Sequence, residues 1–292
     1  MATTALITNP VLIFFIVLVI ILFAPLLLNR IRVPHIVGLI VAGVAVGPFG
    51  FNLLERDSSF AIFGQVGLLY LMFLAGLEID MFHLRLNLRR GLEFGMLTFL
   101  LPMVIGTFAS VYVFHIDWTV SLLMASMYAS HTLISYPVVA RFGITKSPTV
   151  LISIVGTIVA VIGSLLVIAV AVDVSKNGGF ELANLLWILL KLAVYCVSLL
   201  YLFPRISRWF FKKYSDNVTQ YVFVLAMVFL AAWLAQVIGL EAVLGAFYAG
   251  LLLNKFVPNV SPLMNRIEFV GNALFIPYFL IGVGMMVDVR VI

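Results

Sequence analysis

The apolar residues of this chain are grouped in long runs, and this grouping constrains its fold more than any other feature. A helix needs about 20 apolar residues to cross the hydrocarbon core of a bilayer. We therefore predict an all-α, polytopic transmembrane helical bundle of about ten helices. The runs lie near residues 10–28, 35–53, 60–79, 91–114, 119–141, 149–172, 183–203, 218–238, 241–254 and 268–288.

The composition supports this interpretation. Of the 292 residues, 64% are hydrophobic and only 10% are charged, whereas a soluble domain has about 25% charged residues. These polar residues are too few to cover a water-soluble protein of this size. The lipid bilayer is thus the expected surrounding of the chain, and the net charge of +5 is not taken as a sign of nucleic-acid binding.

A tight turn is expected between the eighth and ninth runs. One unbroken helix over both would contain about 36 residues and would overrun the membrane. The turn is predicted at Ile238, Gly239 and Leu240.

The basic residues alternate between the loops. Thirteen of the 17 lysines and arginines follow the first, third, fifth, seventh and ninth runs, and only two lie in the four loops between those. Cytoplasmic loops carry an excess of Lys and Arg. This pattern predicts a multi-pass protein of the cell membrane, with its N-terminus outside and the odd-numbered loops in the cytoplasm.

The fifth run is interrupted by polar residues and a proline. Pro137 cannot donate a backbone hydrogen bond and clashes with the carbonyl of Leu133. Irregular backbone at membrane depth is tolerated only where protein or a water-filled cavity surrounds it. The candidate ion-binding residues are therefore Ser130, His131, Thr132, Ser135, Tyr136 and Pro137. Two alternatives stay open, namely a proline kink bonded by its local hydroxyls and a His131 that is a packing residue rather than a proton relay.

Three carboxylates at the ends of runs are candidates of lower rank. Glu241 begins the ninth run, where the helix dipole favours a negative charge. Glu78 and Asp80 end the third run beside Arg85 and Arg89, and an ion cluster at the membrane surface is the expected role there.

No enzyme signature stands out. The sequence has no metal-ligand spacing of His and Cys, no glycine-rich phosphate loop and no nucleophile motif. We expect neither catalytic residues, nor a cofactor, nor a bound structural metal, nor a nucleic-acid partner.

Four segments resemble the monovalent cation:proton antiporter-2 family, which has a sodium/hydrogen exchanger domain. They are residues 32–43 with Gly47 and Pro48, then 71–80, 239–251 and 275–285. The resemblance implies one transmembrane domain over residues 1–292, truncated at the C-terminus, with the first ten of about thirteen helices of an inverted-repeat fold. It also implies antiport of H⁺ against Na⁺ or K⁺, an ion site at two crossing broken helices, and a homodimer.

One departure from the family leaves two functions open. Family members carry an aspartate in the helix that corresponds to the sixth run, whereas residues 159–164 contain no carboxylate. Either a neighbour such as His131 takes part in coupling, or coupling differs from that of the family, or transport is lost and the protein is a transport-inactive homologue that acts as a membrane sensor or partner-binding subunit.

Overall fold

The computed structural model describes residues 7, 9–29, 35–79, 81–130, 139, 147–177, 182–258 and 260–288. All regular secondary structure in these ranges is helical, which confirms the predicted all-α class. Seven of the described helical stretches are long and apolar enough to cross a membrane, and three shorter apolar helices accompany them.

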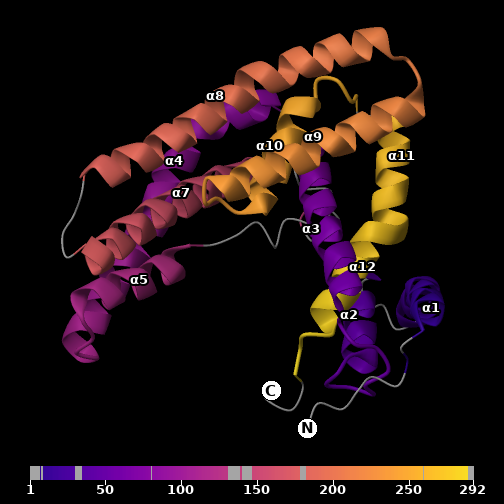
Figure 1. Ribbon diagram of the computed structural model, residues 1–292, viewed down its shortest axis with the longest axis horizontal. Coiled ribbons are helices and arrows are strands. Elements are labelled where there is room, and N and C mark those ends of the chain that lie inside the picture. Colours follow the sequence, from indigo (N-terminus) through magenta and orange to yellow (C-terminus); the bar gives the residue numbers. More distant parts are fainter. Residues whose placement is uncertain are drawn as a thin grey trace. The chain divides into compact units, whose positions relative to one another are not determined.

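Each of the ten predicted runs contains a helix (Figure 1). The helices are α1 (Pro10–Asn29), α2 (His35–Val46), α3 (Ser58–Glu78), α4 (Met81–Phe108), η1 (Ala109–Val113), α5 (Trp118–Ala129), α7 (Pro148–Asn177), α8 (Leu182–Lys213), α9 (Asn217–Val237), α10 (Ala242–Leu253), α11 (Pro262–Val270), η3 (Gly271–Phe275) and α12 (Ile276–Gly284). The two η elements are π-helical turns that continue α4 and join α11 to α12.

Several boundaries differ from the prediction for one physical reason. Helix α4 begins ten residues earlier than the apolar run, and α8 continues to Lys213, ten residues beyond it. Arg85 and Arg89, which were expected in a loop, therefore lie on α4, where Arg89 pairs with Glu93 at 3.0 Å. Hydropathy marks only the part of a helix that suits lipid, whereas the backbone hydrogen bonds continue into the polar turns.

The helices form two compact units, and the first combines residues from both ends of the chain, Met1–Leu71 and Met264–Ile292. Here α2 and α12 approach so closely that a Cβ atom at Gly43 would overlap the carbonyl oxygen of Ile281. A Cβ atom at Gly284 would likewise overlap the carbonyl oxygen of Ile40. Small residues let transmembrane helices approach in this way.

Helix α3 packs on the last span of the same unit. The hydroxyl of Tyr70 donates a hydrogen bond of 2.7 Å to the carbonyl oxygen of Ile267, and both groups are buried. The Tyr70 and Phe275 rings stack with centroids 5.4 Å apart. These contacts fix α3 against the span that contains the π-helical turn.

The second unit is residues Met72–Leu263, and its densest packing joins α4 and α7. A Cβ atom at Gly95 would lie only 2.8 Å from the Cα atom of Gly156, so the two backbones are in direct contact. Helix α5 packs on both of these helices. The result is a three-helix group, α4, α5 and α7, built on small residues.

The predicted turn between the eighth and ninth runs is confirmed. Helix α9 ends at Val237 and α10 begins at Ala242, with Gly239 at a φ of +91°. A side chain at that φ is strained, so glycine is the residue that allows the turn.

The close approach of α2 and α12 leads to a testable prediction. Gly43→Ala and Gly284→Ala should each lower the free energy of unfolding by about 1–3 kcal/mol, because the added methyl meets backbone that cannot move aside. The measurement is the unfolding midpoint of the purified full-length protein in detergent.

Gly64→Ala is the matched control, since no atom lies within 4 Å of the position that its Cβ would take. That change should leave stability unchanged or raise it by up to about 1 kcal/mol, since alanine favours a helix more than glycine. Equal effects of the three substitutions would contradict the packing described here.

Candidate functional site

Helix α5 is too short to cross a membrane. The carboxylate of Asp117 caps its start by accepting a hydrogen bond of 2.9 Å from the backbone N–H of Thr119. Its 12 residues extend over about 18 Å, whereas the hydrocarbon core is about 30 Å thick. Ser130, directly after the helix, is extended with φ −85° and ψ 128°. The regular helix thus stops at the N-terminal edge of the interruption expected from the sequence.

The structure describes Ser130 but not the rest of that polar cluster. Its half-buried side chain follows the last helical residue, Ala129. The remaining candidates stay predictions. The candidate residues outside the described ranges are Asp80, His131, Thr132, Ser135, Tyr136 and Pro137.

A buried serine pair ties the end of α5 to α7. The carbonyl oxygen of Ser126 accepts the backbone N–H of Ser130 at 3.0 Å and also the hydroxyl of Ser164 at 3.1 Å. Ser126 and Ser164 are 0% and 3% exposed, so this bond is shielded from competing water. It holds the last turn of α5 against the middle of α7.

An apolar cluster surrounds the same contact. Ala129 at the end of α5 and Ala160 on α7 belong to one buried cluster, which Phe99 and Met103 of α4 complete. Ala125, one turn before Ala129 on α5, belongs to the same cluster, so α5 packs through two successive turns. The last turn of α5 therefore lies beside α7 in a packed region, and Ser130, directly after it, is half-buried.

Ser126 and Ser164 were not among the candidate residues predicted from the sequence. Ser126 and Ser130 are four residues apart, so they share one face of a helix, and this spacing was a detectable signal. Nothing in the sequence indicates that Ser164, 38 residues away from Ser126, completes the contact. The 159–164 segment, noted for its missing carboxylate, therefore contributes a hydroxyl group.

The described part of this site offers neutral oxygen atoms. The C-terminal end of a helix carries a partial negative charge, equivalent to about half an elementary charge. Broken helices that end at membrane depth use such carbonyls to coordinate cations. The end of α5 is thus chemically suited to a monovalent cation. Among the described residues, no three His, Cys, Asp or Glu side chains are grouped closely enough to hold a multivalent metal.

The lower-ranked carboxylates lie at opposite ends of α10. Glu241 is its exposed N-cap residue and makes no capping hydrogen bond. Glu78 ends α3, where the side-chain amide of Asn254, just beyond α10, donates to the carbonyl oxygens of Leu77 and Ile79. Twelve helical residues separate the two ends, which is about 18 Å. Glu241 and Glu78 therefore do not share one site.

The turn before Glu241 does reach α7. A Cβ atom at Gly239 would lie 3.3 Å from the Cδ1 atom of Leu165, the neighbour of Ser164. The turn between α9 and α10 therefore packs at the same level of α7 as the serine contact.

Comparison with known proteins identifies relatives over nearly the whole chain. The family model described as "Sodium/hydrogen exchanger, transmembrane" matches residues 17–292. The Na(+)/H(+) antiporter NhaS5 of Synechocystis sp. is 39% identical over 283 residues, which cover 96% of this chain and 40% of that protein. The Probable Na(+)/H(+) antiporter 3 of Methanocaldococcus jannaschii is 30% identical over 285 residues.

The relatives differ in how much of their length this chain spans. The match covers 72% of the archaeal protein and 66% of the Na(+)/H(+)-K(+) antiporter GerN of Bacillus cereus, which is 24% identical. This chain thus spans less than half of the cyanobacterial relative and about two thirds to three quarters of the other two.

The serine contact yields a second prediction. Ser164→Ala removes the hydroxyl that bonds to Ser126 and should lower the free energy of unfolding by about 1 kcal/mol, within the range measured for hydrogen bonds between transmembrane helices. The measurement is again the unfolding midpoint in detergent.

Ser153→Ala serves as the control, because the Ser153 hydroxyl is exposed and bonds only within α7, to the carbonyl of Thr149. Its effect should stay within about 0.5 kcal/mol. If Ser153→Ala lowers the free energy of unfolding as much as Ser164→Ala does, the hydrogen bond between α5 and α7 does not contribute specifically to stability.

Proposed function

Because the chain belongs to the sodium/hydrogen exchanger transmembrane family, we propose that it forms the N-terminal part of a secondary active transporter. The transporter exchanges protons for a monovalent cation, Na⁺ or K⁺, across the membrane. The relatives support this assignment, since their names describe Na⁺/H⁺ and Na⁺/H⁺-K⁺ antiporters.

One observation carries the proposal. Helix α5 ends at Ala129 after about 18 Å, with its last turn bonded to α7, and Ser130 continues in an extended conformation. A helix that stops inside the hydrocarbon layer exposes backbone groups that lipid cannot bond. Transporters use such interrupted helices to bind ions near the midplane.

Specific roles follow for the interruption. The carbonyls at the end of α5 and the hydroxyls of Ser130, Thr132 and Ser135 bind the cation. His131 exchanges the proton, since its ordinary pKa lies near neutral pH and residues 159–164 have no carboxylate. Pro137 prevents the helix from closing again over this stretch.

The complete transporter needs more than this chain. Alternating access in this class depends on two inverted repeats that move about a fixed site, and the chain spans only part of its relatives. We assign the activity to the whole protein, working as a homodimer in the cell membrane. Its N-terminus is outside and its odd-numbered, basic loops are in the cytoplasm.

The direct test is ion exchange by the full-length protein in proteoliposomes. A Na⁺ or K⁺ gradient directed into the vesicles should drive protons out and raise the internal pH, and the reverse gradient should lower it. If Na⁺, K⁺ and Li⁺ all fail to move protons, antiport is wrong and the transport-inactive alternative gains support.

The role of His131 gives a separate prediction. His131→Ala should slow the cation-driven pH change by roughly tenfold or more, because a group that transfers protons has been removed. His83→Ala is the matched control, since His83 is exposed on α4. Unchanged flux in His131→Ala would exclude this histidine as the coupling group while leaving antiport itself standing.

A further inference from the structure

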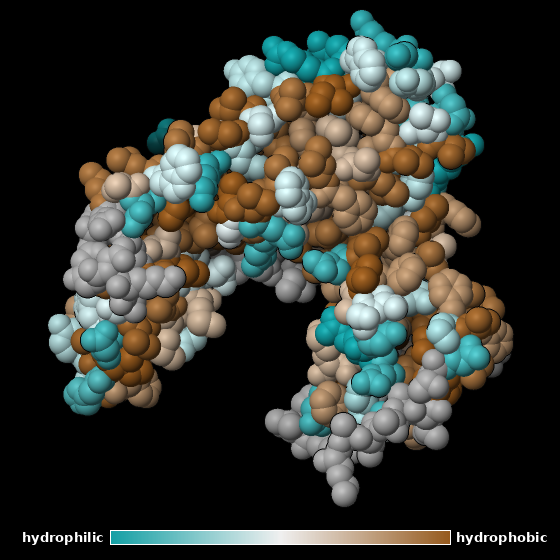
Figure 2. Space-filling model, viewed as in Figure 1, coloured by the Kyte–Doolittle hydropathy of each residue, from teal (hydrophilic) through white to brown (hydrophobic). Residues whose placement is uncertain are grey.

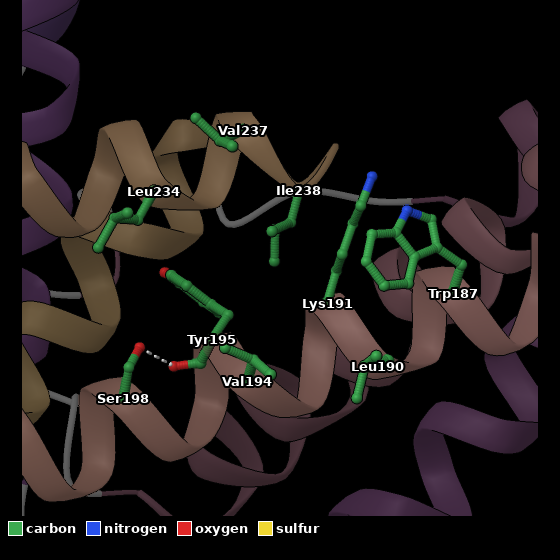
Figure 3. Close-up of a pocket in the computed structure, with 9 residues that line it drawn as sticks. All are labelled: Trp187, Leu190, Lys191, Val194, Tyr195, Ser198, Leu234, Val237 and Ile238. Atoms are coloured by element: carbon green, nitrogen blue, oxygen red, sulfur yellow. Dashed lines mark hydrogen bonds between the residues drawn. The ribbon is translucent and has the colours of Figure 1, made fainter.

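A cavity of about 280 Å³ lies between α8 and α9, and none of the residues that line it belongs to α5 or α7 (Figure 3). Its walls are almost wholly apolar, and Leu190, Val194, Leu234, Val237 and Ile238 supply most of them. Ligand cavities range from about 300 to 1,000 Å³. The space therefore suits one elongated apolar group rather than a whole lipid molecule.

The cavity arises because α8 and α9 are held together at some levels and not at others. Near their connecting loop, the Phe210 and Phe223 rings stack with centroids only 3.9 Å apart. Further along, the Tyr195 hydroxyl donates a 3.2 Å hydrogen bond to the carbonyl oxygen of Ala231. Beyond Tyr195, α8 continues toward Leu182 while α9 ends at Val237, and the cavity occupies this stretch.

The hydroxyl groups in the walls are already bonded. Tyr195 donates to Ala231, and Ser198 donates to the carbonyl oxygen of Tyr195 at 2.8 Å. Their donors are therefore used within the protein, and the interior of the cavity favours a hydrocarbon chain.

A cation stands at one end of this apolar space. Lys191 and Trp187 project side by side from α8, next to Ile238 (Figure 3), and the Lys191 Nζ lies 5.5 Å from the centroid of the Trp187 ring. Lys191 is the only charged residue between positions 182 and 204. A charge within a span is costly and marks a functional contact unless it reaches polar groups. An anion at this end would provide such a contact.

The surroundings of the cavity are those of a lipid-facing surface. Large apolar side chains are exposed along α8, among them Leu186, Leu190, Val197 and Leu200. Figure 2 shows this apolar surface over α8 and α9, with hydrophilic residues gathered where α8 ends and α9 begins. Lys191 lies inside the apolar run 183–203, and from such a position the long side chain of a lysine can reach toward the lipid headgroups.

We propose that this cavity binds an anionic phospholipid from the leaflet that surrounds the N-terminal half of α8. One acyl chain lies along Val194 and Leu234, and the headgroup phosphate pairs with Lys191 beside the Trp187 indole. Attraction between a membrane-proximal lysine and an anionic headgroup gives preference over a zwitterionic lipid. The site is independent of the proposed antiport.

The experiment uses the full-length protein with Trp187 as its only tryptophan, so Trp118, Trp209, Trp233 and any tryptophan outside residues 1–292 are replaced with phenylalanine. Dibrominated phosphatidylglycerol or dibrominated phosphatidylcholine then quenches Trp187 fluorescence in phosphatidylcholine bilayers. We expect phosphatidylglycerol to bind at Trp187 roughly fivefold more tightly than phosphatidylcholine. Lys191→Gln should abolish this preference.

Two further variants test whether the preference for the anionic lipid depends on the cavity as well as on the charge of Lys191. Trp233 on α9 is 58% exposed, like Trp187 at 57%, and does not line the cavity, so a variant with Trp233 alone should show no preference. Val194→Phe fills the cavity and should remove the preference at Trp187 while Lys191 is kept.

Three results would overturn the proposal. Equal quenching by the two lipids at Trp187 would exclude selective binding, and a preference that survives Lys191→Gln or Val194→Phe would exclude this site. Failure of both lipids to quench would mean that protein covers the surface, such as a second copy of the chain.

Discussion

Lipid offers no hydrogen-bond partners to a polypeptide backbone, and this constraint determines how the end of α5 must be built. The helix stops at Ala129, and the first residue beyond it, Ser130, donates its backbone N–H back to Ser126. The Ser164 hydroxyl of α7 donates a second hydrogen bond to the same carbonyl oxygen. The polar groups of this last turn are thus bonded within the protein, and in the function proposed above the interruption is where the ion binds.

Close packing between α4 and α7, through small residues, holds these two helices together beside the end of α5. Gly95 of α4 lies against Gly156 of α7, so these helices meet along their backbones. Inside a membrane, helix association depends on such packing, because lipid is as apolar as the side chains it would replace. A firmly joined pair, α4 and α7, gives α5 a rigid neighbour, and the proposed ion site would have a fixed wall on that side.

The sequence identified the helices well and the contacts between them poorly. The ten runs and the turn at Gly239 were predictable, because hydropathy and membrane thickness are sufficient to locate them. The polar start of α4 was missed, since its arginines suit water and still form a helix. The contact between Ser126 and Ser164 depends on how α5 and α7 align, and hydropathy carries no information about that alignment. The cavity beside Lys191 depends in the same way on where α8 and α9 separate.

The water accessibility of Ser130 tests the central claim most directly. Cys196 is the only cysteine among these 292 residues, so Cys196→Ser, with any cysteine outside them also replaced by serine, provides a background for single-cysteine variants of the full-length protein in membranes. A small water-soluble thiol reagent should modify Ser130→Cys at least about tenfold faster than Val197→Cys, which lies on the exposed apolar face of α8, because water reaches a broken helix but not lipid-facing residues. Equally slow modification of both would contradict an ion-accessible interruption at the end of α5.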